Sequence, residues 1–257
     1  MNQKLTEWAR ACLIFWFLGG FTAFAEAGEV SVGLATNFTT TFKEIAKGFE
    51  KETGHRVIVS TGSTGKLFAQ IRNGAPFEVF LSADCARPRR LEREGWAVQG
   101  SRFTYAVGRL TLWSPKPIGE NFLGPQVLSS GAFHYLAIAN PKTAPYGRAA
   151  RQTLRALKLW SRLKSRIVQG ENISQTFLFV VTGNAEWGFV ALSQVLDPKI
   201  GGKGARWDVP LELYEALNQE AVLLVKGRNN PAAQALLDYL KGPKARLVIE
   251  KYGYGMG

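Results

Sequence analysis

The stretch that decides the fold is residues 57–95, VIVSTGSTGKLFAQIRNGAPFEVFLSADCARPRRLEREG. It contains two short apolar runs, 57–59 and 79–81, whose length is typical of buried strands. A helical pattern follows each run, over 66–73 and 86–94, and a glycine comes directly after each helix as a stop signal. A strand–helix–strand–helix order predicts an α/β domain with a largely parallel sheet.

The same alternation continues outward in both directions. Val30, Val32 and Leu34 predict a strand, and apolar spacing over 42–49 predicts the helix that follows it. Two strand-like runs flank Gly108 within 105–113, and a stretch rich in Pro and Gly, 115–124, comes next. We interpret this point as a crossing into a second lobe.

The second lobe is predicted to contain strands at 135–139 and 187–192 and helices at 147–157 and 173–181. Residues 220–225 predict a returning strand, and two final helices begin near Pro231 and Pro243. The expected organisation is lobe I at 28–108 plus 219–257 and lobe II at 109–218. The ligand of such a protein is expected in the cleft between the lobes.

The first 27 residues have the features of a cleaved signal peptide. Lys4 and Arg10 precede an apolar run over 11–24, and the small-residue patterns at 23–25 and 25–27 resemble a cleavage site. An uncleaved anchor helix is the alternative, but about 14 apolar residues fall short of the roughly 20 that a spanning helix needs. We therefore expect an exported protein located in the periplasm.

Composition and charge narrow the function classes. The chain has 46% hydrophobic and 20% charged residues, as in a globular protein with a sizeable core, and its formal net charge is +12. A basic chain favours anionic partners, but the basic residues are too dispersed for a nucleic-acid reader, so no nucleic-acid partner is expected. After cleavage Cys85 is the single remaining cysteine, and no histidine near it suggests a catalytic pair.

Four strand-to-helix junctions carry small polar residues, at 35–39, 61–65, 140–147 and 170–174. In open α/β sheets ligands bind beyond the carboxyl ends of strands, where such loops meet. Helix N-termini there offer free backbone N–H groups and attract anions. The alternative for each junction is ordinary helix capping. Gly62 and Gly65 favour binding at the second junction, because glycines let a ligand approach the backbone closely.

From about Glu29 to the C-terminus the chain resembles the periplasmic molybdate-binding proteins of ABC importers. The segments that carry this resemblance are 74–84 (GAPFEVFLSAD), 170–173 (GENI), 183–191 (GNAEWGFVA) and 239–243 (YLKGP), with Tyr252-Gly253 near the end. The resemblance implies a two-lobe α/β structure, the type II periplasmic-binding-protein fold, with one oxyanion held in the interlobe cleft by neutral donors. It also implies that the cargo is molybdate and that tungstate binds as well.

Carried over by position, the resemblance implies a set of ligand-binding residues. They are Thr36, Asn37, Ser63, Thr64, Tyr146, Asn172 and Ile173. The commoner form of the family has Ala-Ser at the first loop and Ala in the place of Tyr146, so this chain is similar to the variant whose hydroxyl comes from a different loop. A fully ionised tetraoxyanion only accepts hydrogen bonds, so O–H and N–H donors alone can saturate it. No protein ligand to the metal itself and no further cofactor are expected.

The resemblance further implies capture by hinge closure and delivery to the membrane permease subunits of an ABC importer, by a protein that is expected to be a monomer. Another small oxyanion, such as sulfate or phosphate, is the alternative cargo. An exported enzyme is the rival of another class, but Ser63, Ser82 and Ser174 have no histidine partner in the sequence, so we expect no enzyme. A DNA-binding regulator would need a helix-turn-helix module where the signal peptide stands.

Overall fold

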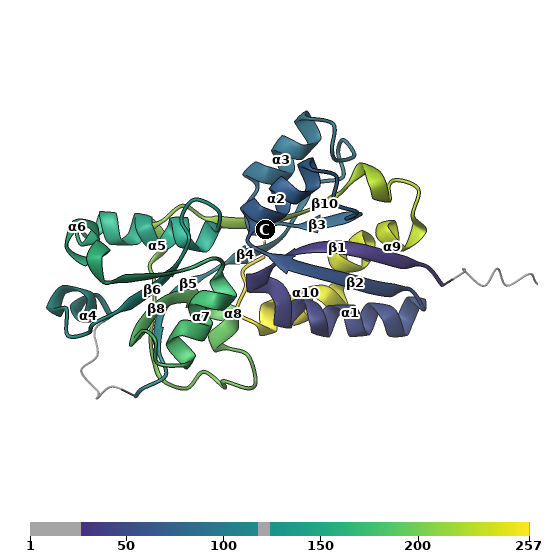
Figure 1. The fold of residues 1–257 in the computed structure, drawn as a ribbon. Coiled ribbons are helices and arrows are strands. Elements are labelled where there is room, and N and C mark those ends of the chain that lie inside the picture. Colours follow the sequence, from purple (N-terminus) through teal and green to yellow (C-terminus); the bar gives the residue numbers. More distant parts are fainter. Residues whose placement is uncertain (1–26, 118–123, 257) are drawn as a thin grey trace, which may run out of the picture.

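The computed structural model describes residues 27–117 and 124–256. The signal peptide expected at 1–27 therefore lies outside the described residues, except for Ala27. Two α/β lobes lie side by side, and each is built around its own five-stranded sheet (Figure 1). This architecture, with two mixed sheets covered by helices, confirms the predicted α/β class and the two-lobe organisation.

The sheet of lobe I has the strand order β2-β1-β3-β10-β4. β1 pairs in parallel with both β2 and β3, whereas β10 is antiparallel to both of its neighbours. The sheet is therefore mixed, and the largely parallel arrangement that we expected holds for β2, β1 and β3 only. Its strands are β1 (Glu29–Ala35), β2 (Arg56–Gly62), β3 (Val79–Leu81), β4 (Phe103–Gly108) and β10 (Leu217–Leu223).

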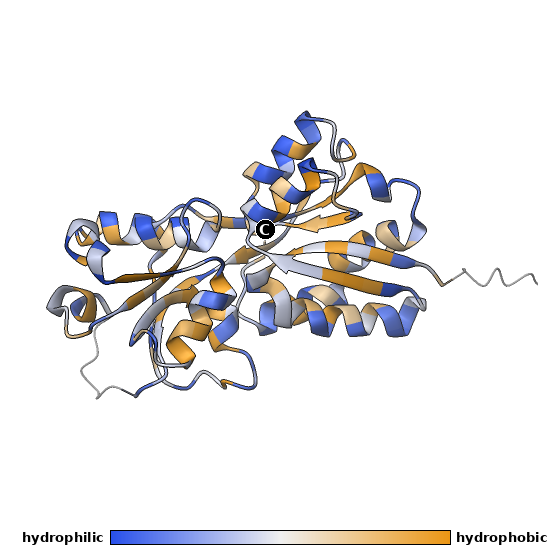
Figure 2. Ribbon diagram, viewed as in Figure 1, coloured by the Kyte–Doolittle hydropathy of each residue, from blue (hydrophilic) through white to orange (hydrophobic). Residues whose placement is uncertain are grey.

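Helices cover both faces of this sheet, and the strand period of two decides which side chain meets which face. In β3, Val79 and Leu81 pack in the core under α1, α9 and α10, whereas Phe80 packs in the core under α2 and α3. The helices are α1 (Thr39–Thr53), α2 (Thr64–Arg72), α3 (Ala86–Arg93), α9 (Pro231–Lys241) and α10 (Pro243–Lys251). Figure 2 shows the result: apolar strands lie beneath helices with one polar side.

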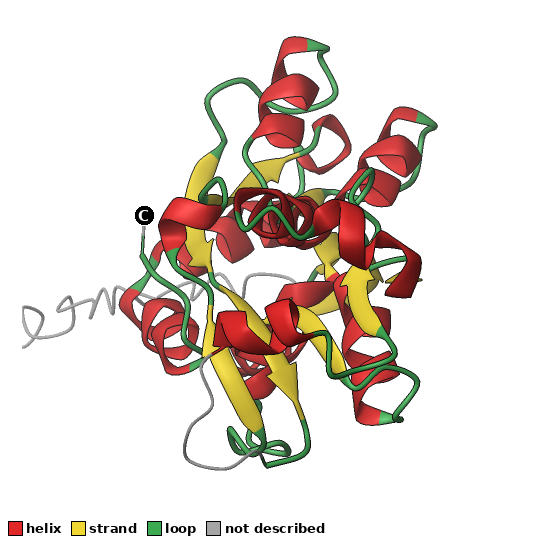
Figure 3. Cartoon of the chain, turned by 90° about the vertical axis from the view of Figure 1, so that its left-hand side faces the viewer, coloured by secondary structure: helices red, strands yellow, loops and turns green. Residues whose placement is uncertain are grey.

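The sheet of lobe II has the order β7-β6-β8-β5-β9. β6 is parallel to β7 and β8, and β5 is antiparallel to β8 and β9. Helices again lie on both sides of the strands (Figure 3). The elements are β5 (Leu110–Ser114), α4 (Gly124–Ser130), β6 (Leu136–Ala139), α5 (Pro145–Ala156), α6 (Trp160–Leu163), β7 (Ile167–Gly170), α7 (Ile173–Val181), β8 (Trp187–Ala191), α8 (Leu192–Val195) and β9 (Ala205–Asp208).

Among the described residues the remaining elements are short 3₁₀ helices: η1 (Thr36–Phe38), η2 (Lys164–Arg166), η3 (Leu211–Leu213) and η4 (Val225–Gly227). β9 and β7 were not expected from the sequence. β9 lies in a stretch of Gly, Lys and Asp without a clear apolar pattern. It is a strand because it pairs with β5. Across 27–117 and 124–256, no helix combines the length and apolar character that crossing a membrane requires.

The chain crosses between the lobes twice, from β4 to β5 at Arg109 and again between β9 and β10. The predicted return to lobe I was residue 219, but β10 begins earlier, and Leu217 and Asn218 already pair with Gly108 and Val107 of β4. β4 and β10 thus run next to each other where the two lobes join. The polar loops of both lobes meet beside this junction.

Candidate functional site

A small cavity lies between the lobes, where the polar loops converge. It is far smaller than the pockets of roughly 300–1,000 Å³ that hold drug-sized organic ligands. The walls are Ala35, Thr36, Asn37, Gly62, Ser63, Thr64 and Ala83 of lobe I and Ala144, Pro145, Tyr146 and Ile173 of lobe II. A solute in this cavity would touch both lobes, and only a compact one could enter it.

All four polar junctions expected from the sequence contribute to these walls. Each follows a strand, β1, β2, β6 or β7, and each precedes a helix, so the strands deliver their loops to one place. Three α-helices, α2, α5 and α7, begin at the cavity, and η1 begins there as well. The first N–H groups of a helix have no partner within the helix, so these helix starts direct positive dipole ends toward the cavity.

Two buried hydroxyls of the second junction face the cavity from lobe I. Ser63 is 3% exposed, and its Oγ has no hydrogen-bond partner among the described residues. Thr64 is 1% exposed, and its Oγ1 accepts a hydrogen bond from the backbone N–H of Ala83 at 3.1 Å. The Thr64 hydroxyl proton therefore remains available to an acceptor in the cavity. A buried hydroxyl without a partner is costly, so Ser63 gains most from a solute that accepts its proton.

The first junction contributes in a way that the sequence did not reveal. The side-chain amide of Asn37 donates to Oε1 of Gln219 at 2.8 Å and to the hydroxyl of Tyr254 at 3.2 Å. Both donor protons of this amide are thus engaged away from the cavity. What Asn37 offers a solute is its backbone at the start of η1, beside the hydroxyl-bearing Thr36 that also lines the cavity.

Tyr146 supplies a hydroxyl from lobe II, from the first turn of α5. Its side chain is 1% exposed, and its hydroxyl oxygen accepts a hydrogen bond from Nε2 of Gln219 at 3.2 Å. Burial, together with the nearby Tyr254 and other tyrosine hydroxyls, raises the pKa of Tyr146 well above its ordinary value. The phenol therefore keeps its proton at physiological pH and can act as a hydrogen-bond donor.

The fourth junction places two neighbouring residues in different roles. Ile173 is buried, lines the cavity and is the first residue of α7, so its backbone N–H has no partner within the helix. Asn172, which we also expected to bind the ligand, does not line the cavity. Its Oδ1 accepts a hydrogen bond from the N–H of Gln175 at 3.0 Å, so its side chain caps α7. For this residue the capping alternative describes the observed contact.

Direct contacts between the lobes surround the cavity. The backbone N–H of Gly65 in lobe I donates to the carbonyl oxygen of Thr143 in lobe II at 2.8 Å. Ser174 and Ser193, both from lobe II, donate through their hydroxyls to backbone carbonyls of the first junction at 3.2 and 3.1 Å. The lobes are therefore in contact on both sides of the cavity in this structure.

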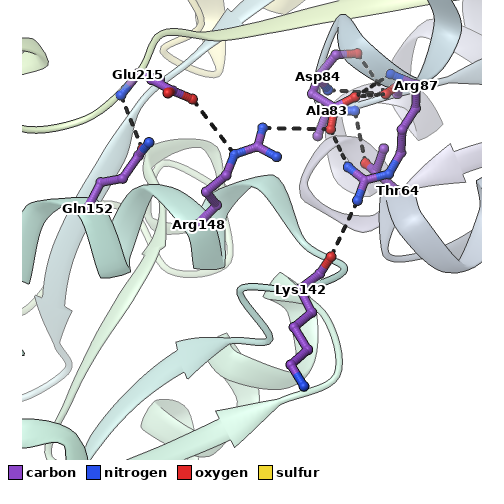
Figure 4. A network of polar contacts seen from close by, with 9 residues as sticks. Thr64, Ala83, Asp84, Arg87, Lys142, Arg148, Gln152 and Glu215 are labelled. Carbon is purple, nitrogen blue, oxygen red and sulfur yellow. Dashed lines mark hydrogen bonds and ion pairs between the residues drawn. The ribbon is translucent and has the colours of Figure 1, made fainter. Parts of the chain in front are cut away.

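Charged residues form a second set of contacts, at the rim (Figure 4). Asp84, at the end of the loop after β3, pairs with Arg87 of its own lobe and lies 3.8 Å from the guanidinium of Arg148, which extends from α5 of lobe II. Arg87 also reaches the carbonyl oxygen of Lys142 at 3.5 Å. Lys66, about half exposed, pairs with Glu171 of lobe II.

The cavity walls themselves carry no charged side chain: the residues that line it are apolar, hydroxyl-bearing or amide-bearing. An anion there would be held by O–H and N–H donors and by helix dipoles, and these can offset the desolvation of a charge without an ion pair. No group of three or more metal-ligating side chains occurs within the described part of the chain. The site is built to hold a small solute that accepts hydrogen bonds.

Two residues near the site were missed in the sequence. The backbone N–H of Ala83 orients Thr64, and Ala83 follows β3 in a segment that we had used for the fold and the family resemblance but not for the site. Gln219 contacts both Asn37 and Tyr146. The sequence offered one sign of it: two residues after Leu217, a polar residue stands on the side of the strand that faces the core. Because we expected the returning strand to start at residue 220, this signal lay outside it.

Two α/β lobes, joined by two crossings around a small cavity of neutral donors, define a class: the solute-binding proteins. The family model described as bacterial extracellular solute-binding protein matches residues 30–255. A molybdate-binding protein ModA of Azotobacter vinelandii is 59% identical over 90% of this chain and 92% of its own length. A molybdate-binding protein ModA of Rhodobacter capsulatus is 48% identical over 90% of this chain and 89% of its own length.

The solved structure of the Azotobacter vinelandii periplasmic molybdate-binding protein has a TM-score of 0.85 to this chain, at 40% identity, over 89% of this chain and 99% of that one. The chain therefore belongs to the bacterial extracellular solute-binding proteins and, within them, to the ModA-type family of periplasmic molybdate-binding proteins. Because this family consists of transport binding proteins, the expectation that the chain is not an enzyme is confirmed.

Proposed function

We propose that this protein captures molybdate in the interlobe cavity and delivers it to the membrane permease subunits of an ABC importer. Tungstate, an oxyanion of the same shape and charge, is held by the same contacts. The protein acts as a monomer in the periplasm after removal of residues 1–27. Its relatives' names support the cargo, and its net charge of +12 favours the approach of any anion.

The observation that carries this proposal is the donor set. The hydroxyl-bearing residues Ser63, Thr64 and Tyr146 line one small cavity, together with the helix-terminal backbone at Asn37 and Ile173. Ser63 Oγ has no partner among the described residues, and the protons of Thr64 and Tyr146 are left free by their other contacts. A tetraoxyanion that only accepts hydrogen bonds complements such donors.

Closure of the lobes around the anion completes the proposal. Ser63 and Thr64 belong to lobe I, whereas Tyr146 and Ile173 belong to lobe II, so an anion gains its full set of contacts only when both lobes touch it. A ligand that binds the closed form better shifts the population toward that form. The two crossings beside Gly108 and Leu217 are where the backbone bends.

The test is a thermal shift of the mature protein with molybdate, tungstate, sulfate and phosphate at equal concentration. A ligand at about 100 times its Kd adds about 2.7 kcal/mol to the free energy of unfolding, which for a chain of this size raises Tm by roughly 5–10 °C. We expect this rise with molybdate and tungstate and little change with the other two anions. A rise with sulfate or phosphate instead would retain the site and refute the cargo.

A further inference from the structure

Gln219 is a fully buried polar side chain at the junction of the two lobes, and it does not line the cavity. It lies on β10, where the register with β4 shifts between Gln219 and Glu220. Such a bulge redirects a side chain, and bulges are common next to functional sites. Burying an amide without hydrogen bonds would be costly, so the partners of Gln219 indicate why it is there.

Its amide connects a loop of lobe I to a residue of lobe II. Oε1 accepts from the side-chain amide of Asn37 at 2.8 Å and from the hydroxyl of Tyr105 at 3.0 Å. Nε2 donates to the hydroxyl oxygen of Tyr146 at 3.2 Å. The Tyr105 hydroxyl is shared with the carbonyl oxygen of Ser82 at 3.2 Å, so Asn37 sets the orientation. The amide nitrogen of Asn37 can only donate, so the oxygen of Gln219 faces Asn37 and its nitrogen faces Tyr146.

This orientation fixes the polarity of the Tyr146 hydroxyl. Because the oxygen of Tyr146 accepts from Gln219, its proton has to point elsewhere, and the cavity that Tyr146 lines is the place where an acceptor can meet it. The pair is also held tightly. A β-carbon at Gly108 would lie 2.4 Å from the Tyr146 hydroxyl oxygen and 2.6 Å from Nε2 of Gln219, so both groups pack against a bare glycine.

We propose that Gln219 is a positioning residue that keeps the Tyr146 hydroxyl a donor toward the anion, so that the site selects fully deprotonated oxyanions over anions that carry a proton. This inference rests on the proposed function. A protonated anion, such as hydrogen phosphate, needs an acceptor for its O–H group. The orientation imposed by Gln219 withholds the oxygen of Tyr146 from that role, and the unmet O–H group weakens binding.

The test compares calorimetric titrations with molybdate and with phosphate at neutral pH. The variants are Gln219→Met, which removes the donor to Tyr146, Asn218→Met as the control on the exposed side of the same strand, Tyr146→Phe, and the double variant. Gln219→Met should weaken molybdate binding roughly 10-fold, in line with one hydrogen bond to a charged group. Phosphate binding should fall less or rise, so that the ratio of the two affinities drops.

In the Tyr146→Phe background the same Gln219→Met change should alter molybdate affinity less than about 2-fold, because residues that act through one another are not additive. An equal loss for both anions, or an equal loss in both backgrounds, would assign Gln219 a purely structural role and overturn the proposal. Unchanged affinities would overturn it as well. A wild-type protein that binds none of the anions would refute the proposed function, and this inference with it.

Gln219→Glu provides a second, isosteric variant in case the Met variant does not fold. It retains the acceptor for Asn37 and Tyr105 but, once ionised, it accepts the Tyr146 proton instead of donating. Molybdate affinity of Gln219→Glu should therefore fall as the pH is raised from mildly acidic to mildly alkaline values, while the wild type changes little. Parallel pH profiles of the two proteins would contradict the inference.

Discussion

Gly65→Ala places a methyl group where the two lobes touch. A β-carbon at Gly65 would lie 2.9 Å from the carbonyl oxygen of Thr143 and 3.0 Å from its Cα, both of them backbone atoms that cannot rotate away. To restore ordinary contact the lobes have to separate locally by roughly 0.5 Å. The 2.8 Å hydrogen bond from the Gly65 N–H to Thr143 would then exceed the usual limit of about 3.2 Å.

The closed form should lose about 1–2 kcal/mol, from one weakened hydrogen bond and looser contacts around it. Since closure is linked to binding, molybdate affinity should fall roughly 5–30-fold. The free protein should behave in the opposite way. Residue 65 is in the first turn of α2, where alanine is a better helix former than glycine by up to about 1 kcal/mol, so Tm without ligand should stay equal or rise.

The assay combines titration calorimetry with melting curves in the absence of ligand. Gly28→Ala is the matched control, because a β-carbon there would lie 3.5 Å from Ala232, in ordinary contact and within lobe I. It should leave the affinity unchanged. If Gly65→Ala binds molybdate as tightly as the wild type, the Gly65–Thr143 contact does not contribute to closure. If it lowers the Tm of the free protein instead, its effect lies within lobe I.

Three further changes test separate parts of the structure. Ser63→Ala removes a buried hydroxyl that has no partner among the described residues, so the Tm should stay unchanged or rise. Calorimetry should show molybdate affinity reduced roughly 10- to 100-fold. An unchanged affinity would exclude Ser63 as a donor. Arg148→Met removes the 3.8 Å contact to Asp84 across the cleft. Because the Arg148 side chain is 35% exposed, molybdate affinity should fall less than about 5-fold and should depend less on salt concentration. A much larger loss would contradict a role at the rim. Burial alone would raise the pKa of Glu186, but hydrogen bonds led by the backbone N–H of Tyr135 outweigh it and lower this pKa to about 2. A carboxyl group with a lowered pKa stabilises the fold at pH values above its ordinary pKa of 4.5, and this stabilisation is lost as the pH falls toward about 2. Glu186→Gln should therefore lower Tm near neutral pH and have the Tm of the wild type near pH 2. A difference in Tm that does not change with pH would refute this assignment.

Most of the fold could be predicted from local sequence patterns. Short apolar runs such as 57–59 and 79–81 give buried strands, and glycines mark the helix ends, because these signals depend on neighbouring residues only. The polar junctions could be predicted in pairs: within each lobe, two parallel strands, β1 with β2 and β6 with β7, bring their carboxyl ends to the same edge of the sheet. β9 could not be found, because its order comes from pairing with β5 rather than from its own residues.

The side-chain contacts of the site were less accessible. Asn37 and Gln219 are 182 positions apart, so no local pattern could show that the amide of Asn37 points away from the cavity. His55 is 7% exposed, and its ring accepts a hydrogen bond from the N–H of Gly28, 27 positions away, which no local pattern reveals either. Asn172 could serve as a cap or as a ligand contact, and only the position of Gln175 distinguishes the two.

The most direct test of the central claim is a crystal structure of the protein grown with molybdate, with the anion located by its anomalous scattering. We expect one strong peak between the lobes, with anion oxygens about 2.7–3.1 Å from Ser63 Oγ, Thr64 Oγ1, the Tyr146 hydroxyl and the backbone N–H of Ile173. A peak held by arginine or lysine side chains at the surface, or a cavity that contains no peak at saturating molybdate, would contradict the account.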